Sequence, residues 1–404
     1  MSDKARKIKV RQTVRVSPER VFDALTQAVR LQEWFCHWAA VDPVVGGPYV
    51  FRWHSGYEVR GTLIEVERPE ELEMIWQGLG EPGQTLVEWE LEEKDGATEV
   101  TLQHVGFGSG PQWDQARAEA EKGWTEALEN LRSVLEDGVD LRDLRRPFLG
   151  IFFDGMSAER AEKEGIATET GVYVTDTVEG GAARQAGLQK GDVIVALGGR
   201  EVRDFGTLTA ALQACHVGDT VEVEVVRKQE RLTITATLQR REAPSLPSSP
   251  LDLAATLRER YAALNARLTE TTAGLTEEEA ARAPAEGEWS VNQTLAHLSI
   301  SERGLQETII NLLSGVRVEG DVNPSVWPEY LAAIIDAEET LAGLLGRLAR
   351  DEEQTALLIE HLAGQLLTEP YRYRLIAQLA TGYEAHGDEH AAQIRRAVEA
   401  LRGQ

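Results

Sequence analysis

The spacing of apolar residues changes in the middle of the chain, at a segment rich in proline and serine, residues 242–250. Before this segment apolar and polar residues alternate, as in Val221, Val223 and Val225, which is typical of strands with one solvated face. After it, apolar residues recur at intervals of three and four, which is typical of helices that bury one side. Pro- and Ser-rich composition favours a linker. The sequence therefore predicts a multidomain α+β protein with an all-helical last domain.

Length, charge and cysteine content limit the possible functions. A chain of 404 residues can hold about two or three domains. The net charge of −25, with no evident basic patch, argues against a nucleic-acid partner. Cys36 and Cys215 fall in different predicted domains, so a reducing compartment is expected. No signal-like apolar segment and no stretch of about 18 apolar residues is present, so we predict a cytoplasmic protein without a membrane span.

The first segment, residues 1–140, has the element order strand, helix, several strands and long helix. Ser17-Pro18 predicts the first helix start, and paired glycines punctuate the strands. The motifs Ser17-Pro18-Glu19-Arg20-Val21-Phe22, Trp34-Phe35, Gly46-Gly47, Gly61, His104-Val105-Gly106-Phe107 and Gly123-Trp124 resemble the AHSA-like branch of the helix-grip (SRPBCC, START-like) fold.

This resemblance implies a curved sheet wrapped around the long helix, with an internal cavity. Five tryptophans are then candidates to line a pocket for an apolar small molecule: Trp34, Trp53, Trp76, Trp89 and Trp124. The alternative is that these rings only fill the core, as large aromatic side chains commonly do. A chaperone-related regulator is a function suggested by this resemblance alone.

The middle segment carries strong turn signals. Gly187 suits the left-handed position that ends a short helix beginning near Ala182. Gly198-Gly199 predicts a two-residue hairpin after the strand at residues 193–197. The order of Phe148-Leu149-Gly150-Ile151, Gly171-Val172-Tyr173-Val174 and Gly180-Gly181-Ala182-Ala183 resembles a PDZ domain, a small β-barrel, of the high-temperature-requirement protease type, over residues 145–241.

The PDZ resemblance implies a peptide site. Phe148, Leu149, Gly150 and Ile151 would form the loop that binds a peptide's C-terminal carboxylate. The peptide tail would then add as a strand beside residues 151–154, with Leu208 and Leu212 walling an apolar pocket. The alternative is a domain that acts only as a spacer. No serine-protease motif appears upstream.

The last segment, residues 251–404, predicts an antiparallel four-helix bundle. Long helices are expected at residues 251–275, 290–313, 327–350 and 371–401, with a shorter piece near 353–366. His386 and His390 are one turn apart on the core side of the last helix, a spacing that suits either a transition metal or structural histidines.

The motifs Glu288-Trp289-Ser290-Val291, Leu295-Ala296-His297-Leu298 and His386-Gly387-Asp388-Glu389-His390-Ala391-Ala392-Gln393-Ile394 resemble the DinB-like family. This resemblance implies that His297, His386 and His390 are three ligands of one divalent metal with open positions. Three imidazoles favour zinc or nickel, and iron or manganese also fit.

Three function classes follow. The first is a cytoplasmic protein that binds a metal, a C-terminal peptide and an apolar ligand. The second is a metal-dependent enzyme of the DinB-like type, a thiol-dependent transferase or a hydrolase. The third is the chaperone- or stress-related regulator. The sequence names no catalytic residue and no oligomeric state.

Overall fold

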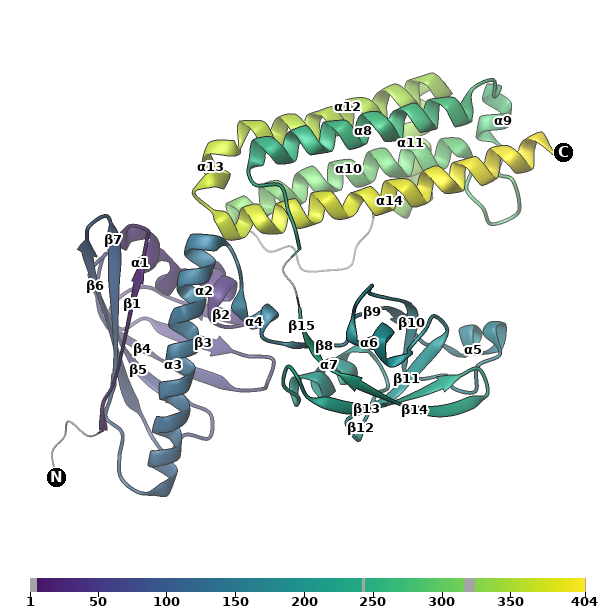
Figure 1. The fold of residues 1–404 in the computed structure, drawn as a ribbon. Coiled ribbons are helices and arrows are strands. Elements are labelled where there is room, and N and C mark those ends of the chain that lie inside the picture. The colour runs from purple at the N-terminus through teal and green to yellow at the C-terminus, as the bar shows by residue number, and fades with distance from the viewer. Residues whose placement is uncertain (1–5, 242–243, 316–323, 404) are drawn as a thin grey trace. The chain divides into compact units, whose positions relative to one another are not determined.

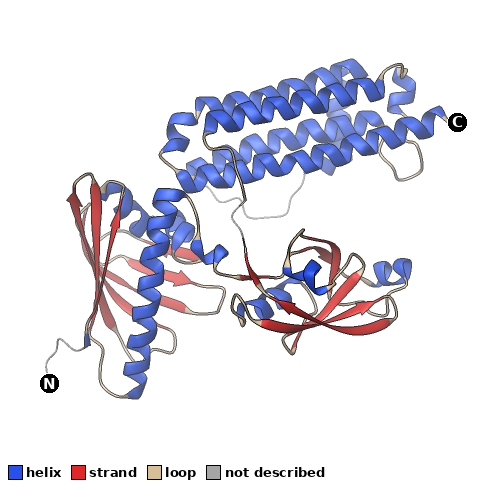
Figure 2. Ribbon diagram, in the orientation of Figure 1, coloured by secondary structure: helices blue, strands red, loops and turns tan. Residues whose placement is uncertain are grey.

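The protein is described by a computed structural model that covers residues 6–241, 244–315 and 324–403. The chain divides into two compact units, Met1–Val139 together with Pro244–Gln404, and Asp140–Ala243. Sheets occupy the first and central segments, and the last segment is helical (Figure 2), so the predicted α+β class is confirmed. Within the described ranges, no helix is both long enough and apolar enough to cross a membrane.

The first segment is one seven-stranded antiparallel sheet with strand order β1-β7-β6-β5-β4-β3-β2. Its strands are β1 (Ile8–Val14), β2 (Trp38–Val41), β3 (Pro48–Arg52), β4 (Glu58–Glu67), β5 (Glu71–Gly78), β6 (Thr85–Lys94) and β7 (Ala97–Val105). The helices are α1 (Pro18–Thr26), α2 (Ala28–Trp34) and α3 (Pro111–Asp137). The predicted element order is therefore confirmed.

Helix α3 packs along one face of this sheet (Figure 1). It begins at Pro111, whose ring suits the first helical position, and ends at Gly138, which has the left-handed conformation of a helix cap. Its side chains Trp124, Leu128 and Leu131 are buried against the inward-facing residues of the strands. This packing makes the apolar core of the segment.

The central unit contains a six-stranded sheet with the main order β14-β13-β11-β10-β9 and β12 paired to β11. The strands are β9 (Ile151–Gly155), β10 (Val172–Thr177), β11 (Asp192–Leu197), β12 (Arg200–Glu201), β13 (Thr220–Arg227) and β14 (Glu230–Thr237), and a separate pair is β8 (Pro147–Phe148) with β15 (Gln239–Arg240). The helices are α4 (Leu141–Leu144), α5 (Ala158–Glu164), α6 (Ala182–Ala186) and α7 (Phe205–Gln213).

The turn signals of this unit are confirmed. Gly187 ends α6 with φ of 91°, which is a left-handed value. Gly198 and Gly199 connect β11 to β12 with φ of 56° and 75°, as a type I′ turn requires. Strand β9 lies at one end of the strand order, so it offers an edge to an incoming chain.

Four long helices form the last segment: α8 (Pro250–Thr272), α10 (Val291–Ser314), α12 (Leu341–His361) and α14 (Pro370–Arg402). Each of α8 and α10 contacts both α12 and α14, which gives the expected bundle (Figure 1). Shorter elements connect them: α9 (Glu277–Ala281), η2 (Pro324–Val326), α11 (Pro328–Glu338) and α13 (Ala363–Leu367). The predicted linker at residues 242–250 includes Glu242 and Ala243, which lie outside the described residues, and Pro250 already belongs to α8.

One helix prediction was wrong. The expected helix at residues 327–350 is broken, because Glu339 adopts a left-handed conformation with φ of 57°. Thr340 then starts a new helix, since its side chain accepts a hydrogen bond from the Gly343 amide. Helix α12 therefore runs through residues 353–361, which the sequence assigned to a separate piece.

A polar layer divides the bundle core into two apolar clusters. Tyr261 donates a hydrogen bond to Glu302 at 2.7 Å, and Asn265 donates one to Glu352. The Gln306 side chain donates to the Asp351 carbonyl oxygen at 2.8 Å. Glu302 and Glu352 are buried, and burial raises the pKa of both carboxyl groups, so their protonation affects the stability of the fold.

Candidate functional site

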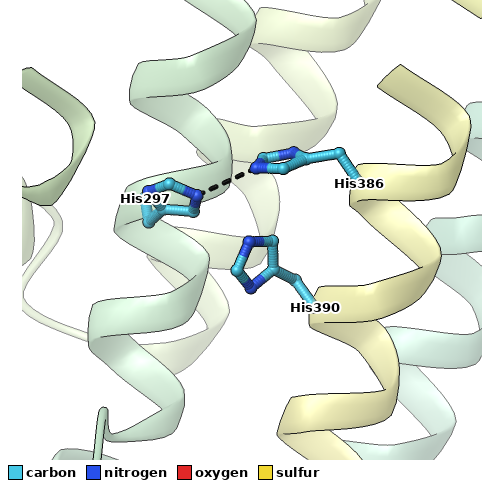
Figure 3. A group of neighbouring side chains, drawn as sticks. All are labelled: His297, His386 and His390. Carbon is cyan, nitrogen blue, oxygen red and sulfur yellow. Dashed lines mark hydrogen bonds between the residues drawn. The ribbon is translucent and has the colours of Figure 1, made fainter. Parts of the chain in front are cut away.

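Three histidines from two helices converge in the bundle (Figure 3). His297 lies on α10, whereas His386 and His390 lie one turn apart on α14. One ring nitrogen from each residue lies within 4.8 Å of the others. The Nε2 atoms of His297 and His386 are 3.0 Å apart. The structure thus brings together all three residues that the sequence proposed as ligands.

The local sequence explains how the helices present these rings. Ser290 and Gln293 form a capping box that fixes the start of α10, two turns before His297. His297 is 4% exposed, in a stretch of α10 (residues 291–300) that is buried on nearly all sides. On α14, the spacing of four residues places the His386 and His390 rings on one side of the helix, with centroids 4.5 Å apart.

Hydrogen bonds to the Nδ1 atoms orient two of the rings. His297 Nδ1 donates to the carbonyl oxygen of Ser325 at 2.8 Å. His390 Nδ1 donates to the side-chain oxygen of Gln393 at 2.8 Å. A neutral imidazole that donates from Nδ1 keeps the lone pair of its Nε2 free. Both rings therefore present Nε2 as a ligand atom, which is the arrangement that metal-binding histidines use.

The donor set and its spacing fit a divalent transition metal. Metal–nitrogen bonds of about 2.0–2.1 Å at tetrahedral angles place two ligand nitrogens about 3.4 Å apart. The 3.0 Å separation of the His297 and His386 Nε2 atoms is close to this value. Three neutral nitrogens also leave coordination positions for water or another ligand.

Burial favours the neutral form of two of these rings, His386 and His297. It lowers the pKa of His386 to about 4, with smaller contributions from the neighbouring His390 and His297 rings. Burial also lowers the pKa of His297, while its hydrogen bond to Ser325 acts in the opposite direction. Because protons compete with metals for imidazole nitrogen, a low pKa removes that competition near neutral pH.

The sequence did not assign three further residues of this site. The Trp289 ring lies 4.9 Å from the His297 ring and stacks at 15° on the His390 ring, so it covers one side of the cluster. Gln393 could have been found from its spacing of three residues after His390. Ser325 could not, because it precedes α11 and reaches His297 only through packing.

Asp388, Glu389 and His361 lie outside the cluster. Asp388 points to Arg267 and forms an ion pair with it. Glu389 and His361 are exposed. These positions agree with the expectation that Asp388 and Glu389 lie off the core stripe.

The five candidate tryptophans of the first segment pack into one aromatic cluster. Trp34, Trp76, Trp89 and Trp124 are buried and Trp53 is half-buried. Trp89 and Trp124 meet edge to face at 5.6 Å, and Phe35 stacks on Trp124 at 5.5 Å. This packing is compatible with either a lined pocket or a filled core, so the apolar ligand stays a prediction.

A buried histidine holds part of this cluster in place. Trp124 Nε1 donates to His104 Nδ1 at 3.0 Å, and His104 Nε2 donates to the Thr85 hydroxyl at 2.7 Å. Burial lowers the pKa of His104 to about 3, so the ring is neutral and structural. In contrast, Trp89 Nε1 is buried without a hydrogen-bond partner in the described part of the chain.

The predicted peptide site lies between β9 and α7. Phe148 ends β8, Leu149 is buried, and Gly150 has φ of 80°, which turns the backbone into Ile151 at the start of β9. Leu208 and Leu212 lie one turn apart on α7. Leu208 belongs to the apolar core of this unit, and Leu212 and Ile151 pack against that core.

An exposed aromatic pair extends this site. Phe153 on β9 and Phe205 at the start of α7 stack with centroids 4.5 Å apart and an angle of 11°. They are 40% and 55% exposed, which is unusual for large apolar side chains. The sequence did not assign this pair, because residues 52 positions apart meet only after the unit has folded.

Three family models match the chain, one after another. The Activator of Hsp90 ATPase homolog 1-like protein matches residues 15–136, the PDZ domain residues 138–238, and the DinB superfamily residues 260–394. Each match coincides with one of the structural segments described above.

Curated relatives resemble the PDZ region. The periplasmic pH-dependent serine endoprotease DegQ of Escherichia coli is 26% identical over 107 residues, which are 26% of this chain and 24% of that protein. A probable periplasmic serine endoprotease DegP-like of Chlamydia trachomatis is 31% identical over 107 residues, 26% of this chain and 22% of that protein. The chain thus spans about a quarter of the length of these relatives.

Solved structures similar to this chain include protein MLL2253 from Mesorhizobium loti, with 24% identity, a TM-score of 0.30, and coverage of 32% of this chain and 97% of that one. The Aha1 dimer from Colwellia psychrerythraea has 23% identity, a TM-score of 0.29, and coverage of 32% and 96%. The three family models match the chain in the order expected for a fusion of an AHSA-type helix-grip domain, a PDZ domain and a DinB-superfamily bundle, and the fold of each segment agrees with its match.

Proposed function

We propose that the protein binds one divalent transition metal in its helical bundle through His297, His386 and His390. The observation that carries this proposal is the convergence of three imidazoles, two of them oriented through Nδ1. A metal held there would supply a Lewis acid with open coordination positions. The residues of the chain would bind and orient it, with Trp289 shielding one side. Zinc and nickel are the ions that we favour.

Metal analysis tests this proposal. The purified full chain is stripped with a chelator, titrated separately with Zn²⁺, Ni²⁺, Fe²⁺ and Mn²⁺, and analysed for bound metal. We expect one equivalent of metal per chain, lost in His390→Ala and retained in His361→Ala, a histidine outside the cluster. If neither zinc nor any other ion binds stoichiometrically, the three residues are core histidines and the proposal is wrong.

We propose further that the PDZ groove binds peptides that end in a free carboxylate and an apolar residue. The edge position of β9, the turn at Gly150 and the apolar wall of Leu208 and Leu212 support this. Micromolar affinity, about −8 kcal/mol, is expected. Amidating the peptide's C-terminus should weaken binding sharply, and equal binding of free and amidated peptides would show that the groove is only a spacer.

We propose that the protein acts in the cytoplasm. We also propose that the first domain binds an apolar small molecule. Cys36 and Cys215 form no disulfide in the described residues, which is the usual state in a reducing compartment. Fluorescence microscopy of the tagged full chain in its native cells tests the location. Native mass spectrometry of the purified protein tests for a retained ligand.

A further inference from the structure

A groove of about 360 Å³ lies at the edge of the seven-stranded sheet. Strand β1, which ends the strand order, and helix α3 form its two sides. The residues that line it are Arg11, Gln12, Thr13, Arg15, Glu99, Arg132 and Glu136. Neither the metal cluster nor the peptide site includes any of them.

The two carboxylates of the groove already have cationic partners. Glu136 accepts a hydrogen bond from the Arg15 backbone amide at 2.8 Å and forms an ion pair with the Arg15 side chain at 2.5 Å. The Glu136 side chain on α3 is only 7% exposed, so the surrounding residues hold this partner of Arg15 in place. Glu99 forms an ion pair with Lys94 at 2.9 Å, and this lysine is the main reason that the pKa of Glu99 is lowered.

The two remaining arginines are not paired in this way. In residues 6–241, 244–315 and 324–403, the side chain of neither Arg11 nor Arg132 forms a hydrogen bond or an ion pair. Arg11 interacts with Glu99 only at a distance, as a minor contributor to its lowered pKa. Arg15 is paired with Glu136, and Lys94 is shared between Glu92 at 2.7 Å and Glu99 at 2.9 Å. The lining itself therefore holds three arginines against two glutamates. The groove is therefore locally cationic, although the whole chain has a net charge of −25.

Two neutral polar residues also line the groove. Gln12 donates its side-chain amide to the Thr13 carbonyl oxygen at 3.0 Å. The Thr13 side chain is exposed beside it. A hydroxyl group next to two guanidinium groups is a set of donors suited to oxyanions.

We propose that this groove binds a small molecule through its carboxylate or phosphate group, held between Arg11 and Arg132. Guanidinium groups bind both kinds of oxyanion with two parallel hydrogen bonds. The groove volume is at the lower end of small-ligand sites, about 300–1,000 Å³. An acidic polypeptide fits less well, because beyond the groove it would face a chain with 67 acidic against 42 basic residues.

Titration calorimetry of the full chain at low ionic strength tests this site, with inorganic phosphate and succinate as separate probes. We expect one of the two probes to bind, and the preferred probe identifies the oxyanion. The double variant Arg11→Gln/Arg132→Gln should weaken this binding at least about tenfold. Arg11→Lys/Arg132→Lys should bind with intermediate affinity, since it keeps the charge but loses the paired hydrogen bonds. Arg117→Gln, on α3 but outside the groove and paired with Glu121, should bind like the unchanged protein.

Circular dichroism confirms that the variants are folded. Equal binding by the double glutamine variant and the unchanged protein would overturn the proposal. Binding of neither probe by the unchanged protein would also overturn it. Binding of a polyglutamate peptide alone would overturn the small-molecule assignment and identify a polypeptide partner instead.

Discussion

The Nε2 atoms of His297 and His386 lie 3.0 Å apart, although 89 positions separate the two residues in the chain. Without a metal, this contact must be a hydrogen bond between two imidazoles, in which only one ring donates. With a metal, both lone pairs would point to the ion. A bound metal would therefore replace this hydrogen bond between the two helices, so metal binding should change the stability of the bundle.

Removing metal should destabilise the bundle. A ligand that binds only the folded state adds about 2.7 kcal/mol of stability when its free concentration is 100 times its Kd. We expect a chelator to lower the melting temperature of the zinc-loaded protein, and excess zinc to restore it. His386→Ala should melt at the same temperature with and without chelator. If the chelator lowers the melting temperature of both proteins equally, its effect does not pass through this cluster.

Changing Gln393 should weaken metal binding without removing a ligand. Its side-chain oxygen accepts the hydrogen bond from His390 Nδ1 at 2.8 Å. Loss of such an orienting partner lowers metal affinity about 10–100-fold. Gln393→Ala should show this loss in a competition titration against a zinc-binding dye. Gln393→Glu, which keeps an acceptor, should retain most of the affinity; equal affinity of Gln393→Ala and the unchanged protein would contradict the assigned role.

Glu352 should make the bundle less stable at alkaline pH. Burial raises its pKa to about 8, and the nearby Glu302 and Asp351 act in the same direction, while the hydrogen bond from Asn265 opposes them. The folded state thus keeps a proton that the unfolded chain releases above its ordinary pKa of 4.5. Raising the pH from 5 to 8 then favours unfolding, by at most about 1.4 kcal/mol per pH unit.

Glu352→Gln tests this effect, because it keeps the shape and accepts the Asn265 hydrogen bond without a charge. Urea unfolding at several pH values should show a flatter pH dependence and higher stability above pH 7. Glu353→Gln is the matched control, since Glu353 is partly exposed and paired with Arg258. Parallel pH profiles for Glu352→Gln and the unchanged protein would show that Glu352 does not hold the proton.

Phe205→Ala should change peptide binding more than folding. The ring stacks on Phe153 beside the groove and is 55% exposed, so its loss removes little buried surface. We expect a fall in stability of about 0.5–1.5 kcal/mol from the lost aromatic pair. Peptide affinity should fall as well, because the pair extends the apolar wall. Phe152→Ala, which changes the neighbouring exposed ring on β9, should leave fluorescence-anisotropy titrations unchanged. Unaltered peptide affinity in Phe205→Ala would show that the aromatic pair is not part of the peptide site.

Replacing either of two tryptophans of the first domain by phenylalanine should change the stability of the protein by different amounts. Trp124→Phe removes the donor to His104 Nδ1 and leaves that buried nitrogen unpaired. Trp89→Phe removes a buried N–H that has no partner in the described residues. Both changes remove similar ring volume, so Trp124→Phe should be more destabilising by about 1–3 kcal/mol in urea unfolding. An equal or larger loss in Trp89→Phe would show that its N–H has a bound acceptor in solution, such as the interior ligand.

Signals confined to a few neighbouring residues predicted most of the fold. Gly187 ended its helix and Gly198-Gly199 made the hairpin, because positive φ is a local requirement. The Trp327 to Arg350 helix failed for a related reason. Its apolar spacing continued through Glu339, but the local backbone there turned left-handed and Thr340 offered a new cap.

The sequence by itself determined that His386 and His390 share one face, since a helix brings residues four apart to the same side whatever surrounds them, whereas His297 was named only by the family resemblance. Only the tertiary structure decided what stands around them and what else the surface offers. The Ser325 carbonyl reaches His297, Phe205 reaches Phe153, and Arg132 joins Arg11 in one groove through packing between distant segments. Helical and strand periods fix which side a residue faces, whereas a contact between elements depends on how whole faces pack, which no short stretch of sequence specifies.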